Sequence, residues 1–243
     1  ISVIDKRLER IGRIIAVAGG KGGVGKSACA AVTALELARS GKRVGLLDAD
    51  FTGSSAHIFL GTELHFPAED RGITPPEAGF GLRFMSAASF SGERGLALRG
   101  AELTDVFLEL FAVTRWDELD FLLIDMPPGL GDEVLDVIRY VERLETVLVT
   151  TPSLVSARVV SRLAVLLEET GVPVRGLIEN MVREGSASGS AYAKALEEMG
   201  ANVIASVPYA GDLENAIGEP EALLETRFAE ALRPAVAAID GEG

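Results

Sequence analysis

The sequence has little cysteine, a deficit of positive charge and no long apolar run. Cys29 is the only cysteine in 243 residues, so there is no disulfide framework, and one thiol cannot form a four-thiolate metal site. No uncharged apolar run reaches the ~20 residues that span a bilayer. Lys and Arg number 23 against 36 Asp and Glu, a net charge of -13. These absences predict a cytoplasmic protein that binds neither membranes nor nucleic acid, because an acidic surface repels both.

The chain instead contains a regular alternation of apolar strands and amphipathic helices. Strands are predicted over 13–20, 42–50, 82–87, 145–152, 174–181, 202–208 and 119–129, the last running into a turn. Helices are predicted over 25–41, 102–114, 132–144, 153–171, 190–200 and 220–239. Because helices connect successive strands, we expect an α/β fold whose mostly parallel sheet has helices on both faces. We expect one domain over 1–243, with 1–12 as an N-terminal extension, 13–220 as the core and 221–239 as a C-terminal helix.

The clearest motif lies between the first predicted strand and the next helix. Residues 20–27 read GKGGVGKS, which fits the phosphate-loop pattern G-x-x-x-x-G-K-[ST]. Glycines let backbone N–H groups curl around phosphate oxygens, and the helix N-terminus adds partial positive charge. In this pattern Lys26 bridges the β- and γ-phosphates, and Ser27 ligates Mg²⁺. The residues expected to bind ATP here are Gly20, Lys21, Gly22, Gly23, Val24, Gly25, Lys26, Ser27 and Ala28.

Carboxylates are expected beside this loop, because they end predicted strands. Asp125 closes the apolar run FLLID, the position of a Mg²⁺-holding residue in such ATPases. Asp48 and Asp50 end another predicted strand, and we expect their side chains to point to opposite faces if the strand persists. One of the two would approach Mg²⁺, directly or through water, while the other positions the attacking water.

Residues 21–27, KGGVGKS, also resemble the deviant Walker A motif of the MinD, ParA and Mrp ATPases. Lys21 is the additional lysine of that motif. In this group the early lysine reaches the partner's nucleotide across a dimer that sandwiches two ATP molecules. The resemblance therefore implies a three-layer P-loop NTPase fold and a homodimer in which Lys21 serves the neighbour's ATP. A cation arriving in trans would stabilise the transferring phosphoryl group, so hydrolysis would depend on dimerisation.

Within the group, the best match is to the Mrp-type iron–sulfur cluster carrier ATPases. The matching blocks are 41–61, 98–100, 116–133, 147–153, 173–181 and 207–220. Ser54 departs from the pattern, because DADxxGPS has proline there. The resemblance implies that Asp50 orients the hydrolytic water, leaving Asp48 with Ser27 and Asp125 for Mg²⁺. It also implies that Asn180 hydrogen-bonds adenine and that the loop after Pro208 closes over the base. Switch II, which senses the γ-phosphate, would comprise Asp125, Pro127, Pro128 and Gly129.

The resemblance fails at the cluster site. Mrp-type carriers place a C-x-x-C pair shortly after the E-N-M block, and two such pairs in the dimer hold one cluster. Here the block is followed by VREGSASGSAY, residues 182–192, without cysteine or histidine. His57 and His65 have no metal-motif spacing, and Cys29 is expected to be a buried packing residue. We therefore expect ATP and Mg²⁺ as cofactors, and no iron–sulfur cluster from the residues present.

The sequence thus predicts a Mg²⁺-dependent ATPase, slow alone and stimulated by dimerisation or a client. The favoured interpretation is a Mrp-like ATPase assisting iron–sulfur cluster or other metalloprotein assembly, with a client metalloprotein or assembly factor as partner. The alternative is a MinD- or ParA-like positioning or partitioning switch, although the terminal helix has no basic membrane-binding face. A non-enzymatic nucleotide-binding subunit is a third interpretation, and the intact Lys21, Lys26, Asp50 and Asp125 argue against it.

Overall fold

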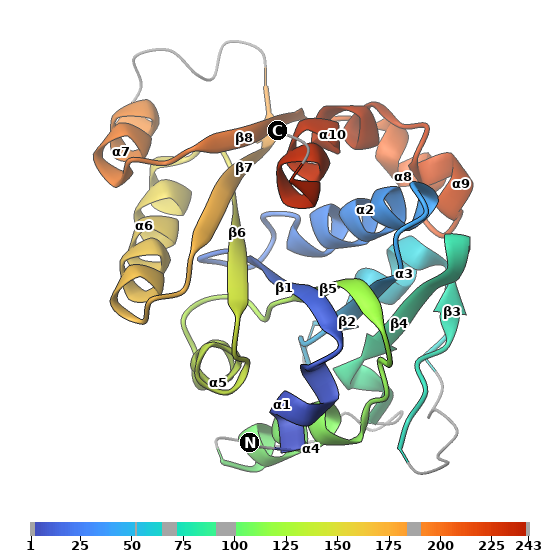
Figure 1. Cartoon of the computed structure of the whole chain (residues 1–243). Coiled ribbons are helices and arrows are strands. Elements are labelled where there is room, and N and C mark those ends of the chain that lie inside the picture. Colours follow the sequence, from blue (N-terminus) through green and yellow to red (C-terminus); the bar gives the residue numbers. More distant parts are fainter. Residues whose placement is uncertain (1–2, 52, 65–71, 91–100, 184–190, 242–243) are drawn as a thin grey trace.

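The strands form one sheet that is parallel except at one edge. The computed structural model describes residues 3–51, 53–64, 72–90, 101–183 and 191–241. Within these residues eight strands lie in the order β3-β4-β2-β5-β1-β6-β7-β8 (Figure 1), and only β3 pairs antiparallel. Their bounds are β1 (Ile11–Ala18), β2 (Val44–Asp48), β3 (Glu77–Ala78), β4 (Leu82–Ser86), β5 (Leu119–Asp125), β6 (Leu144–Thr150), β7 (Val174–Val182) and β8 (Val203–Pro208).

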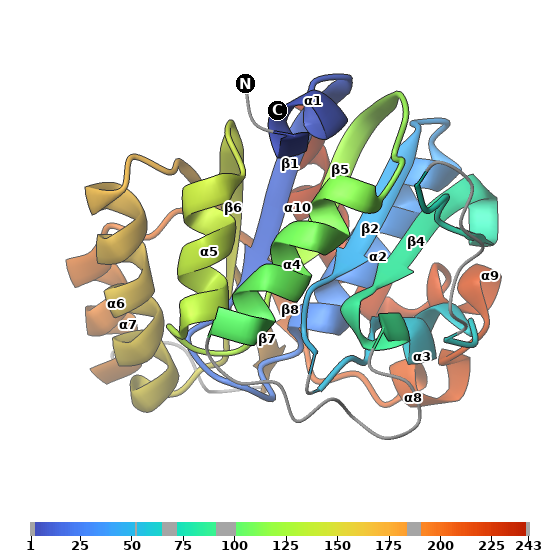
Figure 2. The same ribbon diagram turned by 90° about the horizontal axis from the view of Figure 1, so that it is seen from below.

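Helices cover both faces of the sheet, as the sequence predicts. Figure 2 shows α4, α5, α6 and α7 on one side and α2 and α10 on the other. The helices are α1 (Val3–Leu8), α2 (Lys26–Arg39), α3 (Ala56–Leu60), α4 (Ala101–Val113), α5 (Asp132–Tyr140), α6 (Leu154–Glu169), α7 (Ala191–Met199), α8 (Asp212–Ala216), α9 (Pro220–Leu223) and α10 (Arg227–Asp240). Short 3-10 turns occupy Gly79–Gly81 and Ala87–Phe90. In the described residues, no helix combines the length and the apolar character that a bilayer span requires.

The central strands are apolar on both sides because each side faces a separate core. On β1, Ile15 and Val17 join the core that contains α2 and α10, whereas Ile14 and Ala16 join the core that contains α4, α5 and α6. Strand alternation sends successive side chains to opposite faces. This explains why β1 reads as a continuous apolar run rather than as an alternating one.

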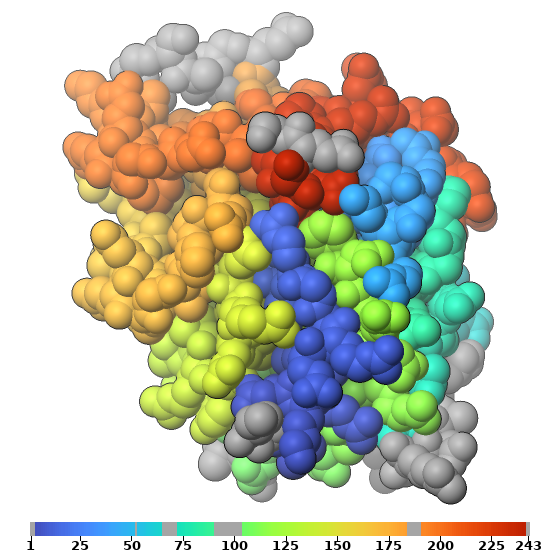
Figure 3. Space-filling model, in the orientation of Figure 1, coloured from blue at the N-terminus to red at the C-terminus, as the bar shows by residue number. Residues whose placement is uncertain are grey.

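An ion-pair cluster joins the sheet to the last helix at the amino edge. Glu145 on β6 accepts hydrogen bonds from Arg13 on β1, at 3.0 and 2.6 Å, and from Arg175 on β7. Arg13 also donates to the carbonyl oxygen of Ile239 in α10. The Arg13 hydrogen bonds are the main reason that the pKa of Glu145 is lowered. Figure 3 shows the N-terminal residues and the end of α10 reaching the surface on this face.

The chain ends differ in detail from the prediction. The expected continuous helix over 220–239 is wrong, because α9 and α10 are separated by residues 224–226. Thr226 has extended backbone and caps α10, its hydroxyl accepting a hydrogen bond from the N–H of Ala229 at 3.2 Å. Within the predicted N-terminal extension, α1 buries Ile4 and Leu8, and β1 begins at Ile11, two residues earlier than expected.

Candidate nucleotide site

The glycine loop lies at the carboxyl edge of the sheet, between β1 and α2. Its backbone requires glycine at two places. Gly25, before the first residue of α2, has φ 87, and a Cβ there would lie 2.1 Å from Nδ2 of Asn180. A Cβ on Gly20 would lie 2.7 Å from the backbone of Val159 in α6. The two ends of the loop are therefore packed against α6 and β7, which restricts the backbone there to glycine.

Two lysines flank this loop without salt-bridge partners in the described residues. Lys26 is the first residue of α2 and is only 7% exposed, although it carries a charge. Lys21 is half-buried, as is Ser27, which follows Lys26. Within the part of the chain that the structure describes, neither lysine has a carboxylate within 4.0 Å. Both ammonium groups are thus available for phosphate oxygens.

Asp125 is a buried carboxylate whose two oxygens have no hydrogen-bond partner. It ends β5, between the ends of β1 and β2, and is 1% exposed. Burial, together with the charge of the neighbouring Asp48, raises its pKa to about 8. The hydroxyl of Ser27 lies near the carboxylate without forming a hydrogen bond of good geometry. Ser27 and the charge of Lys26 both act to lower the pKa of Asp125. An unpartnered buried carboxylate beside a hydroxyl fits Mg²⁺, which prefers hard oxygen ligands.

Asp48 holds the loop that follows β2. It is fully buried, and burial raises its pKa although three hydrogen bonds favour the charged form. Its Oδ1 accepts from the N–H of Asp50 at 3.1 Å, and its Oδ2 accepts from Oγ of Ser54 at 2.6 Å and from the N–H of Ala56 at 3.2 Å. Its role in binding Mg²⁺ remains a prediction, while its role in ordering this loop is visible.

The expectation that Asp48 and Asp50 point to opposite faces of one strand is wrong. Residues two apart on a strand would share a face, and Asp50 lies outside β2, which ends at Asp48. The half-buried Asp50 instead belongs to a loop, and its Oδ1 accepts from the N–H of Gly53 at 2.8 Å. The only sequence signal for the hydrogen bond from Ser54 to Asp48 was that Ser54 replaces the proline of the DADxxGPS pattern.

The segment after β5 is hydrogen-bonded to the chain just before the glycine loop. The N–H of Met126 donates to the carbonyl of Val17 at 3.1 Å, and that of Gly129 to the carbonyl of Gly19 at 3.4 Å. Pro127 between them is buried and Pro128 is exposed. The predicted switch II is therefore hydrogen-bonded, on both sides of its two prolines, to the end of β1 and to the residue just before the phosphate loop.

Asn180 braces the phosphate loop from β7. Its Nδ2 donates to the carbonyl of Val24 at 2.9 Å, and its Oδ1 accepts from the N–H of Met181 at 2.8 Å. Because the side chain is buried and both of its polar atoms are engaged, its contact with adenine remains a prediction. The structure does bring Asn180 and Pro208 to one side of the loop, since β7 pairs β8 and the N–H of Tyr209 donates to the carbonyl of Val182 at 3.0 Å.

Two residues at these strand ends were missed by the sequence reasoning. Tyr209 directly follows Pro208 and is largely exposed, and the Arg183 guanidinium carbon lies 5.6 Å from the centroid of its ring. An aromatic residue immediately after a strand-ending proline was the available signal. The pair offers a flat surface beside the loop, of the kind that stacks on a planar base.

Cys29 is a packing residue, as predicted. It is fully buried in the core beneath α2, and burial raises the pKa of its thiol to about 12. In the described residues, no group of three His, Cys, Asp or Glu side chains could hold a metal ion. Residues 184–190, most of the stretch where a C-x-x-C pair was sought, lie outside the described residues, as does the block 98–100.

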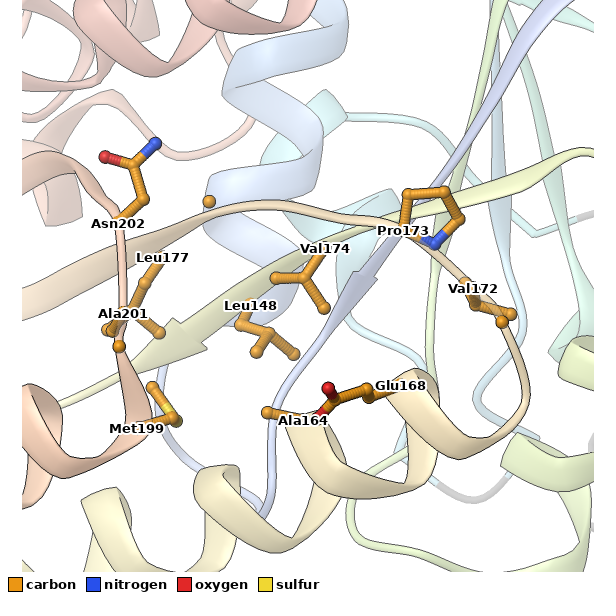
Figure 4. A pocket seen from close by; sticks show the side chains of 13 residues that line it. Leu148, Ala164, Glu168, Val172, Pro173, Val174, Leu177, Met199, Ala201 and Asn202 are labelled. Carbon is orange, nitrogen blue, oxygen red and sulfur yellow. The ribbon is translucent and has the colours of Figure 1, made fainter.

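A cavity of about 430 Å³ lies at the opposite, amino edge of the sheet. Figure 4 shows Leu148, Val174 and Leu177 around it, with Met199 and Glu168 at the ends of the neighbouring helices. Because it opens between the amino ends of β7 and β8, it is separated from the glycine loop by the length of the strands. None of the predicted site residues lines it.

Parallel strands that end in carboxylates around a glycine loop define a P-loop nucleotide-binding protein. Comparison with known families agrees with this class. The model of the ParA family, described as NUBPL iron-transfer P-loop NTPase, matches residues 10–238. The chain belongs to this family, and the resemblance to the Mrp-type carriers is confirmed.

Relatives and solved structures support the assignment. An iron-sulfur cluster carrier protein of Pseudomonas fragi is 36% identical over 233 residues, which cover 90% of this chain and 81% of that protein. One of Deinococcus radiodurans is 41% identical over 177 residues, 72% of this chain and 50% of the relative, so the chain spans half of that protein. A nucleotide-binding protein of Archaeoglobus fulgidus in complex with ADP has a TM-score of 0.76 and 32% identity, covering 91% of both chains. The MinD cell division ATPase of Pyrococcus furiosus, at 21% identity and a TM-score of 0.70, shares the fold.

Proposed function

We propose that this protein is a Mg²⁺-dependent ATPase that acts as a homodimer in iron–sulfur cluster or other metalloprotein assembly. The observation that carries the proposal is the buried, unpartnered carboxylate of Asp125 beside Lys26 and Ser27. Such a group is costly unless a cation joins it, and a Mg²⁺–nucleotide complex supplies that cation. A purely structural loop would not need this arrangement.

Each site residue has a specific part in the proposed reaction. Lys26 would bind the β- and γ-phosphates from the start of α2, and Ser27 and Asp125 would hold Mg²⁺. When bound, Mg²⁺ neutralises charge on the phosphates. Asp50 would position the attacking water from the loop anchored on Asp48. Asp50 is half-buried, so its carboxylate keeps some exposure for a water molecule.

The homodimer is supported by apolar side chains exposed near the glycine loop. Leu130, Leu154 and Val155 are 38, 43 and 64% exposed, and they follow the carboxyl ends of β5 and β6. These two strands flank β1, which leads into the loop. Apolar surface next to a functional site is typical of a protein interface. A second copy meeting this surface would bring its own Lys21 toward the nucleotide, where that lysine would stabilise the transferring phosphoryl group.

The proposed cargo is a metal centre held by a client rather than by this chain. The relatives from Pseudomonas fragi and Deinococcus radiodurans are named iron-sulfur cluster carrier proteins. The single cysteine, Cys29, is fully buried, so its thiol is not exposed to a partner. The ATPase would therefore couple its nucleotide state to a client metalloprotein or assembly factor, in the reducing cytoplasm that suits a cysteine-poor chain.

Turnover and dimerisation test the ATPase directly. ATP hydrolysis would be measured with Mg²⁺ for the wild type, Lys26→Ala, Lys21→Ala and the control Lys194→Ala, an exposed lysine on α7. We expect Lys26→Ala to lose nucleotide binding, and Lys21→Ala to bind ATP but hydrolyse it poorly. Light scattering should show an ATP-dependent dimer. The proposal fails if the wild type has no turnover even at concentrations that favour dimerisation, or if Lys26→Ala hydrolyses normally.

Reconstitution tests the cargo. Anaerobic incubation with iron and sulfide, followed by metal and sulfide analysis, should leave the chain without a stoichiometric cluster. About two irons per chain, the ratio of a four-iron cluster bridging two chains, would overturn this part of the proposal if the loading depends on residues of the chain.

A further inference from the structure

The hydroxyl of Ser54 stands at a junction beside the nucleotide site. Ser54 belongs to the Asp50 loop, defined here as residues 49–55 between β2 and α3, of which residue 52 lies outside the described chain. Its Oγ donates to Oδ2 of Asp48 at 2.6 Å and lies 2.9 Å from Oγ of Ser86. Nδ1 of His57 lies 3.3 Å away. One side chain thus touches the ends of two neighbouring strands.

Ser86 gives this junction a fixed second anchor. It ends β4 and is the register partner of Asp48 on β2. Its side chain is buried, and its Oγ accepts from the N–H of Ala88 at 3.2 Å. Ser54 therefore fastens the Asp50 loop to two adjacent strand ends rather than to one.

The direction of the hydrogen bonds follows from the number of protons. A serine hydroxyl has one proton to donate. Because Ser54 donates to the Asp48 carboxylate, Ser86 must donate to Ser54, while Ala88 donates to Ser86. The result is a one-way chain of donors that ends on a buried carboxylate, an arrangement in which each bond polarises the next.

Asp48 connects this chain to Asp50. Its Oδ1 accepts from the N–H of Asp50, and its Oδ2 accepts from both Ser54 and the N–H of Ala56. Asp48 therefore holds the loop and the first residue of α3 at three points, two through the backbone and one through the side chain of Ser54. Ser54 supplies the point that a substitution can remove without altering the backbone.

We propose that Ser54 is a positioning residue for ATP hydrolysis, fixing the Asp50 loop through Asp48 and Ser86 so that the Asp50 carboxylate orients the attacking water. The inference rests on the proposed ATPase function and adds a residue to it. Ser54 does not touch the reacting atoms. Its loss would leave the phosphate loop and Asp125 in place but let the Asp50 loop move, and a displacement of about 1 Å can cost ~100-fold in rate.

The test separates turnover from binding. ATPase kinetics with Mg²⁺ would be measured for the wild type, Ser54→Ala, Ser54→Thr and Ser86→Ala, with calorimetric binding of a non-hydrolysable ATP analogue. We expect Ser54→Ala to lower kcat by about tenfold or more, with KM and analogue affinity within about twofold of the wild type. Ser54→Thr, which keeps the hydroxyl, should retain most of the turnover. Ser86→Ala should cause a smaller fall in kcat, and the double variant should add little to Ser54→Ala.

A matched control removes another buried hydroxyl at the far edge of the sheet. Thr114 donates to the carbonyl of Leu110 at 2.6 Å, at the end of α4. Thr114→Val should lower Tm while leaving kcat unchanged, as expected of a merely structural hydroxyl. Unchanged kcat in both Ser54→Ala and Ser86→Ala, or a failure of Ser54→Thr to restore turnover, would overturn this inference and leave the proposed ATPase function standing. No turnover in the wild type would overturn the proposed function and this inference with it.

Discussion

Replacing Asp125 by asparagine should stabilise the nucleotide-free protein while abolishing its ATPase activity. The carboxylate is buried without a hydrogen-bond partner, and it lies beside the charge of Asp48. Asparagine has nearly the same shape and resembles the neutral, protonated carboxyl group. The substitution therefore removes the cost of placing a second negative charge in this site, and with it a ligand for Mg²⁺.

The size of the effect follows from the pKa. Burial raises the pKa of Asp125 from 3.8 to about 8, so the folded protein holds a proton that the unfolded chain has already released. Wild-type stability should therefore fall as pH rises from about 4 to about 8. Between pH 5 and pH 8 this is at most ~4 kcal/mol, from about 1.4 kcal/mol per pH unit. Water entry and relaxation reduce such costs, so we expect about 2 kcal/mol, or roughly 4–8 °C in Tm.

Thermal unfolding at the two pH values is the assay. Asp125→Asn should exceed the wild type in Tm at pH 8 by clearly more than at pH 5. Asp105→Asn, which alters an exposed carboxylate on α4, is the matched control and should follow the wild type at both values. Addition of Mg²⁺ and ATP should raise the Tm of the wild type more than that of Asp125→Asn. The reasoning is refuted if the Tm difference between variant and wild type is the same at pH 5 and pH 8, or if the variant is less stable at pH 8.

Three further predictions concern the loop, the amino edge and the core. Gly20→Ala should weaken ATP binding by more than about tenfold in calorimetry, because its Cβ would lie 2.7 Å from the backbone of α6. The control Lys194→Ala, on the exposed face of α7, should bind normally. Glu145→Ala should lower the free energy of unfolding in urea by about 2 kcal/mol at pH 7. Because Arg13 lowers the pKa of Glu145, that loss should shrink below pH 4, and a constant loss would count against the ion pair. Cys29 should resist an aromatic disulfide reagent at pH 8 and react fully in urea, because its thiol is buried and has a pKa of about 12. Rapid labelling of the folded protein would contradict its packing role.

Much of the fold was predictable because its signals are local. The run of residues 13–20 and the helix after it enclose the glycine loop within about thirty residues of sequence, and β1 and α2 form there. The C-terminal helix was predicted with a wrong boundary for an equally local reason. Its helical periodicity continues through residues 224–226, where Thr226 adopts an extended backbone and begins a new helix.

The placement of the proposed site residues was predictable in part. The pattern around Lys26 and the strand-ending Asp125 indicated a phosphate site and a cation ligand, and the structure brings them together. It also assigns Asn180 a partner, Val24, that lies 156 residues away in the chain. From the sequence, Asn180 was expected only to contact adenine, because no local pattern records a contact with a distant segment.

The sequence by itself determined the class of protein, since the pattern G-x-x-x-x-G-K-[ST] between a strand and a helix is a local signal of a phosphate loop. It also determined that the chain lacks a C-x-x-C pair, because that follows from its single cysteine. Tertiary structure alone decided which polar groups meet at the ends of β2, β4 and β5. Ser54 and Ser86 are 32 residues apart, and only the parallel pairing of β2 with β4 places them 2.9 Å from each other. The desolvation of Asp125 was decided in the same way, because burial arises from all the elements that pack around a residue and not from its neighbours in sequence.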